Sequence, residues 1–402
     1  MQIVAPEAVG ISAARLSNIG SRLQRYVAQG KVAGFVTLVA RDSEVAHFEA
    51  CGFRDAENKL PMERDSIFRI YSMTKPITSI ALMQLYERGK FQLSEPVSRY
   101  IPQFGKTKVL SGLGYLGQQL EPQNPPMTIQ HLLTHTAGLS YGFYLDSPID
   151  EMYRNSIFRS ETATLEEKIT GMAELPLRFQ PGSAWNYSIA TDVCGYLVQV
   201  LADMPFEDYL AAEIFQPLGM IDTAFHVSAD RLDRFAKLYQ HLPQTGGFRE
   251  YKGDPKIPSH DYSKPASAPS GGGGLVSTTG DYWRFANMLL NQGILGDRRI
   301  IGRKTLEFMT RNHIRPELLP LAIGPTPIPG RGFGLGFDVV MDAAQTGVLN
   351  SDGNYGWSGA AATNFWVDPQ ERLVGIIMTQ LMDNMLPFQQ DFRVLTYQAL
   401  VD

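Results

Sequence analysis

The sequence predicts a mixed α/β fold in which one unit is built from both ends of the chain and a mostly helical segment interrupts it. Three observations indicate this. β-Rich runs occur near the N-terminus and again beyond residue 333, and helical patterns dominate between them. The third is size: 402 residues, 44% of them hydrophobic, suffice for about two to three structural units. We expect an α/β unit at 1–93 plus 265–402, a helical unit at 94–264 and a cleft between the two.

The N-terminal part predicts a helix, a hairpin and a second helix. Residues 12–29 place Leu16, Ile19 and Leu23 at helical spacing, with Ser12 as the N-cap. Residues 35–40 and 44–50 are two β-rich runs joined by a short polar turn, which predicts a hairpin. Residues 72–88 carry apolar side chains nearly all round the helix, which is typical of a buried central element.

The remaining chain alternates helices and loops and then returns to strands. The inserted unit has helical patterns at 129–134, 165–175, 192–202 and 206–215. A connector rich in Pro, Ser and Gly precedes the C-terminal part. There we expect helices at 279–291, 302–311 and 387–400, and strands at 333–341, 363–368 and 373–379.

Charge and cysteine content exclude several classes of function. The net charge is −5 and no Lys/Arg cluster is present, so we expect neither a nucleic acid nor a membrane surface as partner. Cys51 and Cys194 are too few for a disulfide framework and are interpreted as buried free thiols. The first residues lack the pattern of a secretory signal, and no apolar run approaches the ~20 residues of a membrane span. We expect a cytoplasmic protein that can form a homo-oligomer.

Ser72 and Lys75 form a Ser-x-x-Lys motif at the start of the buried helix, and Ser72 alone among the serines has a lysine three residues on. Pro76 fits a first helical turn, so the helix begins at or near Ser72. Residues three apart share a helix face, which lets the lysine amine reach the serine hydroxyl. To accept the serine proton the amine must be neutral; lowering its pKa from about 10.4 to about 7 takes about 4.6 kcal/mol and requires burial. The alternative is a helix N-cap beside a solvated lysine.

Two further segments are candidates for the same site. A Pro-Gly turn at 181–182 presents Tyr187, which is either a second proton-transfer group, its pKa lowered by nearby Lys75, or a packed aromatic. Small residues at 356–362 lead into a strand. They either let a backbone N–H approach a substrate, as an oxyanion hole requires, or make a tight strand entry.

Taken together, these motifs resemble the serine β-lactamase-like hydrolases over nearly the whole chain. The greatest similarity is to the family VIII carboxylesterases, relatives of class C β-lactamases and D-Ala-D-Ala carboxypeptidases. The resemblance is carried, in order, by Ser72-x-x-Lys75, the run His131-Leu132-Leu133-Thr134-His135-Thr136-Ala137-Gly138-Leu139, Phe179-x-Pro181-Gly182 with Tyr187-Ser188, and Trp357-Ser358-Gly359.

The resemblance implies a fold with an antiparallel sheet flanked by helices and a role for each motif residue. Ser72 would be the acylated nucleophile and Lys75 its general base. Tyr187 would shuttle protons to the leaving alcohol and activate the deacylating water. The N–H groups of Ser72 and Ala360 would form the oxyanion hole. No cofactor and no metal are implied.

Two departures from the family pattern bear on the substrate. Ile189 stands where the lactamases and peptidases carry the Asn of Tyr-x-Asn, and Trp357 stands where they carry the lysine of Lys-Thr-Gly. That lysine helps to bind a substrate carboxylate, and tryptophan offers no positive charge for one. We therefore expect a neutral, small-molecule ester with an apolar acyl or alcohol group. The expected substrate-binding residues are Trp357, Ser358, Gly359, Phe143, Tyr144 and Ile189.

Other readings stay open at this point. β-Lactamase, D-amino-acid peptidase and acyltransferase activities share Ser72, as does a non-catalytic sensor that is acylated without turnover. Ser140 lies in a G-x-S-x-G match, but that motif needs a preceding strand and here a helix is expected. His131 and His135 have the spacing of a metal pair, but Leu132 stands where zinc proteases need Glu, so we interpret both as structural. The glycines at 271–274 are interpreted as backbone passing close to the cleft.

Overall fold

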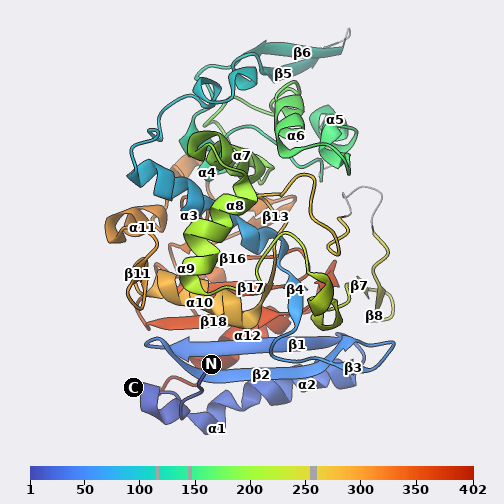
Figure 1. Ribbon diagram of the computed structural model, residues 1–402, viewed down its shortest axis with the longest axis vertical. Helices are drawn as coiled ribbons and strands as arrows, with labels where there is room; N and C mark the ends of the chain where they lie inside the picture. The colour runs from blue at the N-terminus through green and yellow to red at the C-terminus, as the bar shows by residue number, and fades with distance from the viewer. Residues whose placement is uncertain (115–116, 144–146, 254–259) are drawn as a thin grey trace.

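An eight-stranded antiparallel sheet forms the centre of the computed structural model, which describes residues 1–114, 117–143, 147–253 and 260–402. Strands from the two ends of the chain meet in its middle, where β18 pairs with β1 (Figure 1). The mixed α/β prediction with strands from both termini is confirmed. In spatial order the strands are β14 (Arg331–Phe333), β15 (Asp338–Val340), β16 (Tyr355–Ser358), β17 (Asn364–Asp368), β18 (Leu373–Met378), β1 (Gly34–Arg41), β2 (Glu44–Asp55) and β3 (Leu60–Pro61).

Helices cover both faces of this sheet. α1 (Ala13–Leu16), α2 (Asn18–Ala28) and α12 (Phe388–Tyr397) pack on one face, where the rings of Phe35 and Phe388 meet edge to face. α10 (Thr279–Leu290) packs on the other face. Successive side chains of a strand point to opposite faces of the sheet. Because helices cover both faces, the side chains of β1 and β18 are buried on both, and the two strands are nearly continuous apolar runs in the sequence.

Several predicted elements differ in detail. The helix expected at 12–29 is divided at Ser17 into two helices, and the Ser17 hydroxyl donates there to the carbonyl of Ala14. Ser12 is the N-cap as predicted. The strand expected at 333–341 is split into β14 and β15. Gly336 lies in the intervening turn with φ of 97°, and a Cβ there would overlap the Ser79 hydroxyl.

In its described residues the inserted segment contains two hairpins besides its helices. β5 (Lys108–Gly114) pairs with β6 (Gly117–Pro122), at the end of the molecule farthest from the sheet (Figure 1). β7 (Tyr239–Leu242) pairs with β8 (Gly247–Glu250) and also with β19 (Leu381–Met382). Its helices are α4 (Ile129–Leu133), α5 (Pro148–Arg154), α6 (Leu165–Met172), α7 (Ala190–Ala202), α8 (Phe206–Leu210) with a π-helical turn at Ala211–Phe215, and α9 (Gln216–Leu218). The unit boundaries themselves stay a prediction.

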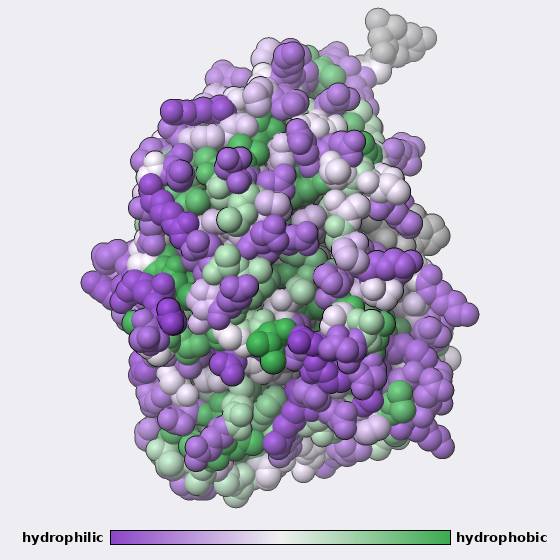
Figure 2. All heavy atoms as spheres, viewed as in Figure 1, coloured by the Kyte–Doolittle hydropathy of each residue, from purple (hydrophilic) through white to green (hydrophobic). Residues whose placement is uncertain are grey.

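The remaining elements are short. β4 (Ile67–Arg69) pairs with β9 (Val276–Thr278) and precedes a 3-10 turn, Tyr71–Met73. α11 (Arg303–Met309) follows a small hairpin, β10 (Ile294–Leu295) with β11 (Arg298–Arg299), and β12 (Leu321–Ile323) pairs with β13 (Thr326–Ile328). None of the described helices has the length and apolar character that crossing a bilayer requires. The face drawn in Figure 2 carries mostly hydrophilic side chains, with hydrophobic ones in separate small groups.

α3 (Thr74–Glu87) is the central helix, and every residue from Thr74 to Leu85 is buried. It packs against α7 at the centre of the large core. The prediction of a helix buried all round is confirmed. Because α3 carries Lys75 in its first turn, the core that holds this helix also holds the site.

Shortening a side chain in the middle of α3 is expected to destabilise the whole fold. Leu82 is 0% exposed, so Leu82→Ala should lower the free energy of unfolding by about 2–5 kcal/mol, through lost burial and a residual cavity. Denaturant titration measures this. Val394→Ala, at an exposed position of α12, is the control and should change it by no more than about 0.5 kcal/mol. Equal effects of the two variants would contradict the central role of α3.

Candidate active site

Ser72 and Lys75 meet at the junction of the 3-10 turn and α3. The Lys75 Nζ lies 3.2 Å from the Ser72 Oγ, 2.8 Å from the Tyr141 hydroxyl and 2.6 Å from the Gly272 carbonyl oxygen. Lys75 is 1% exposed, and burial lowers its pKa to about 7, partly offset by the negative charge of Asp192. A neutral amine has two N–H groups, which can donate hydrogen bonds to Tyr141 and Gly272. Its one lone pair then faces Ser72. The geometry therefore suits an amine that takes the Ser72 proton.

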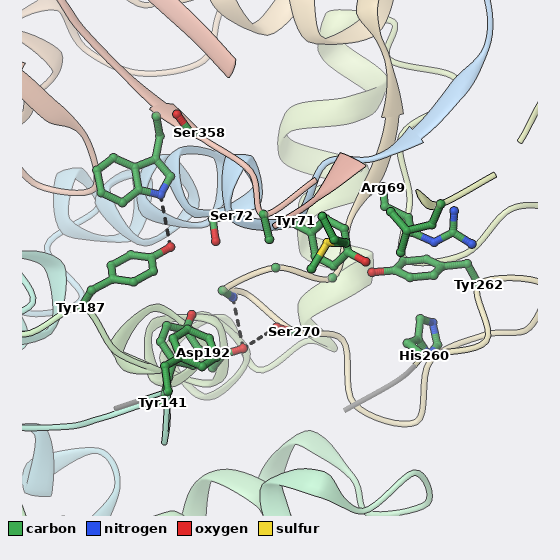
Figure 3. Close-up of a pocket in the computed structure, with 18 of the residues that line it drawn as sticks. Arg69, Tyr71, Ser72, Tyr141, Tyr187, Asp192, His260, Tyr262, Ser270 and Ser358 are labelled. Atoms are coloured by element: carbon green, nitrogen blue, oxygen red, sulfur yellow. Dashed lines mark hydrogen bonds between the residues drawn. The ribbon is translucent and has the colours of Figure 1, made fainter. Parts of the chain in front are cut away.

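Tyr187 lies beside Ser72, whose side chain acts to lower the pKa of Tyr187. The indole Nε1 of Trp357 donates to the Tyr187 hydroxyl at 3.2 Å (Figure 3). The Lys75 Nζ lies 4.5 Å from the centre of the Tyr187 ring. The predicted lowering of the Tyr187 pKa is wrong: burial raises it well above 10. A buried phenolate loses its hydration, and the interactions with Ser72 and Trp357, which lower the pKa, do not compensate for this loss. Tyr187 is therefore a neutral phenol that can donate its proton.

The expected oxyanion hole lies where β16 ends beside the 3-10 turn. No described residue accepts a hydrogen bond from the N–H of Ser72 or of Ala360, so both donors are free for a substrate oxygen. Gly359 brings the two segments together, because a Cβ there would overlap the Ile70 carbonyl oxygen. Tyr71, directly before Ser72, has φ of 44°, a left-handed conformation that is strained for a tyrosine and is found most often at functional sites.

A cavity of about 1310 Å³ opens on Ser72. Ser72, Tyr187, Tyr141 and Asp192 surround its inner end in Figure 3. Of the expected substrate-binding residues, Trp357, Ser358 and Phe143 line it, and the Phe143 ring stacks on that of Tyr141 with centres 4.6 Å apart. The apolar side chains that also line it include Phe158, Leu165 and Ile169.

Two expected substrate-binding residues do not line the cavity, and the position of a third is not described. Ile189 does not line the cavity: it is fully buried, because its side chain packs into the core at the start of α7. Gly359 does not line it either, since it packs against Ile70 and Thr363 and acts on the site through the backbone. Tyr144 lies outside the residues that the structure describes.

The structure adds Tyr141, Gly272 and Asp192 to the site. Tyr141 belongs to the segment that resembles a nucleophile elbow, and Gly272 to the four glycines that were expected near the cleft, an expectation that the Gly272–Lys75 hydrogen bond confirms. Asp192 was expected only as the first residue of a helix. No sequence signal separates it from an ordinary acidic residue at a helix N-terminus.

The residues that mimic other motifs have structural partners. The Ser140 hydroxyl is buried and donates to Asp150 at 2.6 Å, outside the cavity. His131 accepts from the Thr128 N–H in a capping box. His135 is fully buried, with its ring 5.0 Å from that of Tyr187, and burial lowers its pKa well below 6.5. Among the described residues no cluster of three or more His, Cys, Asp or Glu side chains is arranged for a metal ion.

The fold and this buried serine–lysine–tyrosine arrangement define a serine hydrolase of the β-lactamase-like type. The sequence model of the Beta-lactamase family matches residues 19–399, and the chain belongs to that family. Protein Rv1367c of Mycobacterium tuberculosis is 34% identical over 355 residues, covering 87% of this chain and 86% of that protein. Esterase EstB of Burkholderia gladioli is 31% identical over 389 residues, covering 93% of each.

Solved structures agree with this assignment. EstCE1, described as a hydrolase with promiscuous acyltransferase activity, has a TM-score of 0.79 at 27% identity and covers 98% of this chain, which covers 99% of it. Simvastatin synthase LovD of Aspergillus terreus has a TM-score of 0.80 at 24% identity, with coverage of 96% and 98%, and supports the fold. The protein is thus an enzyme whose relatives include esterases and acyltransferases.

Proposed function

We propose that the protein is a serine carboxylesterase that hydrolyses small or medium apolar carboxylic esters through an acyl-enzyme. The observation that carries this is the hydrogen bond from Trp357 to the Tyr187 hydroxyl. It places a neutral, largely apolar side chain beside the nucleophile, at the position where lactamases and peptidases of this type carry a lysine. Two relatives support the ester: EstB, and the lovastatin esterase of Penicillium rubens, 28% identical over 92% of this chain and 95% of that one.

Acylation begins with transfer of the Ser72 proton to the Lys75 amine while the Ser72 Oγ forms a bond to the ester carbonyl carbon. The N–H groups of Ser72 and Ala360 hold the negative oxygen of the tetrahedral intermediate. The bond from the carbonyl carbon to the alcohol oxygen then breaks. The alcohol leaves with a proton from Tyr187, which recovers one from the Lys75 ammonium, so the acyl-enzyme forms with neutral side chains.

Deacylation reverses these roles with water in place of the alcohol. Tyr187 and Lys75 take a proton from the water as its oxygen attacks the acyl carbon, and Ser72 leaves with a proton returned by Lys75. Bond formation and cleavage balance without a cofactor.

Acyl transfer to a second alcohol is the other candidate. Two observations favour it: the cavity of about 1310 Å³ has room for an acceptor beside the acyl group, and relatives include the acyltransferase calJ of Penicillium decumbens, 28% identical over 82% of this chain and 80% of that one. An alcohol that enters ahead of water would give a new ester from the same acyl-enzyme.

Substrate comparison tests the proposal. Pre-steady-state and steady-state kinetics are measured on short-chain p-nitrophenyl esters, a chromogenic cephalosporin and a D-alanyl peptide, with and without an added primary alcohol. We expect a burst followed by steady turnover on the esters. Their kcat/KM should be at least about 100-fold above that on the other two substrates, which corresponds to about 2.7 kcal/mol of transition-state stabilisation at 1.36 kcal/mol for each factor of ten. Preferred turnover of the cephalosporin or peptide would contradict it, and a burst without turnover would indicate an acylated sensor. Product ester formed in the presence of the alcohol would support acyl transfer.

A further inference from the structure

Asp192, in the first turn of α7, is a buried carboxylate that lines the cavity. It is 1% exposed, and Figure 3 shows it hydrogen-bonded to Ser270. Its Oδ1 accepts hydrogen bonds from the Ser270 hydroxyl and from the Gly272 N–H, the latter at 3.1 Å. Its Oδ2 has no hydrogen-bond partner among the described residues. A buried carboxylate is costly unless it is paired or hydrogen-bonded, so this one calls for an explanation beyond packing.

Gly272 connects this carboxylate to the lysine. Its N–H binds Asp192, and its carbonyl oxygen accepts the shortest of the three hydrogen bonds of the Lys75 amine, at 2.6 Å. The backbone of Gly272 lies close to both Asp192 and Tyr141. A Cβ on Gly272 would overlap the Asp192 Oδ2 and lie 2.8 Å from the Tyr141 hydroxyl, which is the second hydrogen-bond partner of the Lys75 amine. Asp192 thus binds the N–H of the residue whose carbonyl oxygen binds Lys75.

We propose that Asp192 is a positioning residue of this active site: it holds Gly272, and through Gly272 it holds the Lys75 amine against Ser72. The inference rests on the proposed function, because Lys75 must act as the base for its position to matter. The hydrogen bonds of Asp192 go to Ser270 and Gly272 and not to Ser72, so it acts on the nucleophile through Lys75.

A second consequence concerns charge. The negative charge of Asp192 raises the pKa of Lys75 against the lowering by burial, and the Lys75 charge in turn lowers the pKa of Asp192, which burial raises. Removing the charge from residue 192 should therefore lower the pKa of Lys75, so that the amine stays neutral at more acidic pH. The titratable groups that face this pair are Lys168, His135, Tyr141, Tyr187 and Cys194.

The pH profile of kcat/KM on a p-nitrophenyl ester tests this. Asp192→Asn keeps an oxygen for Ser270 and Gly272 but removes the charge, and should move the acid limb to lower pH by about one unit. Asp192→Ala removes the hydrogen bonds as well, and should lower kcat about tenfold or more while KM changes less. Asp150→Asn is the matched control, because Asp150 is also a fully buried carboxylate that accepts from a serine hydroxyl. It should leave the acid limb in place.

A second pair of variants tests the link from Asp192 to Lys75 even if the Asp192 variants do not fold. Gly272→Ala forces Asp192 and Tyr141 apart, whereas a Cβ on Gly273 meets its nearest neighbour, Tyr71, at an ordinary 3.7 Å. We expect a much larger fall in kcat for Gly272→Ala than for Gly273→Ala. A wild-type kcat in Asp192→Ala, or equal kcat in the two glycine variants, would overturn the positioning role of Asp192, and an unmoved acid limb in Asp192→Asn would overturn its effect on the charge of Lys75. Wild-type protein without ester turnover would instead overturn the proposed function.

Discussion

Ser72→Ala is expected to lower kcat/KM on p-nitrophenyl esters by on the order of 10³-fold or more, because no acyl-enzyme can form without the Ser72 oxygen. The burst of p-nitrophenol should vanish with it. Mass spectrometry of wild-type protein quenched during turnover should find the acyl group on Ser72 and find none on the variant. The fold should persist, since Ser72 lies at the cavity and contributes little to the core.

Ser140→Ala is the matched control, because Ser140 is the serine of the competing motif and is of the same size. Its hydroxyl donates to the buried Asp150, so the variant should lose about 1 kcal/mol of stability and retain its turnover. Turnover that survives in Ser72→Ala and disappears in Ser140→Ala would reverse the assignment of the nucleophile.

Lys75→Ala and Tyr187→Phe are each expected to lower kcat by about 10²–10⁴-fold, the range of general acid–base catalysis. The double variant should fall little further, because the two side chains move the same proton between Ser72 and the leaving alcohol. Tyr209→Phe is the control: Tyr209 is also a buried tyrosine, in α8, and it does not line the cavity. Losses that multiply in the double variant would show that Lys75 and Tyr187 act independently.

The pH profile gives the same prediction an independent readout. Lys75 accepts a proton only in its neutral form, and its pKa is about 7. In wild type, kcat/KM should therefore be constant above about pH 7 and should fall tenfold for each pH unit below it. The residual activity of Lys75→Ala should lack this limb. The pKa of Tyr187 is raised, so no loss from phenolate formation is expected near neutrality.

The parts of the fold that follow from local pattern were predictable. Strand runs such as Gly34–Arg41, and the buried helix Thr74–Glu87, are decided by the spacing of their apolar residues. Elements without that signal were missed: the β5–β6 hairpin has no apolar alternation, and β16 is a short run that includes a glycine. Their strands exist because backbone groups must pair, which a single-segment pattern does not reveal.

The candidate site divides in the same way. Ser72 and Lys75 are three residues apart on one helical turn, so their contact is encoded in the chain itself, and the motif order placed Tyr187 and Trp357 beside them. Ile189 was misplaced because a position in a motif does not say which way a side chain faces at the start of a helix. The inward side of α7 is chosen by the core.

What the linear order of residues established about this protein is its class, its serine–lysine pair and the absence of a carboxylate-binding lysine at Trp357. Only the tertiary structure decided the state of those groups. The raised pKa of Tyr187 and the link from Asp192 through Gly272 to Lys75 depend on burial and on contacts between residues up to 197 positions apart. Desolvation and long-range hydrogen bonds are properties of the packed site, and no local spacing encodes them.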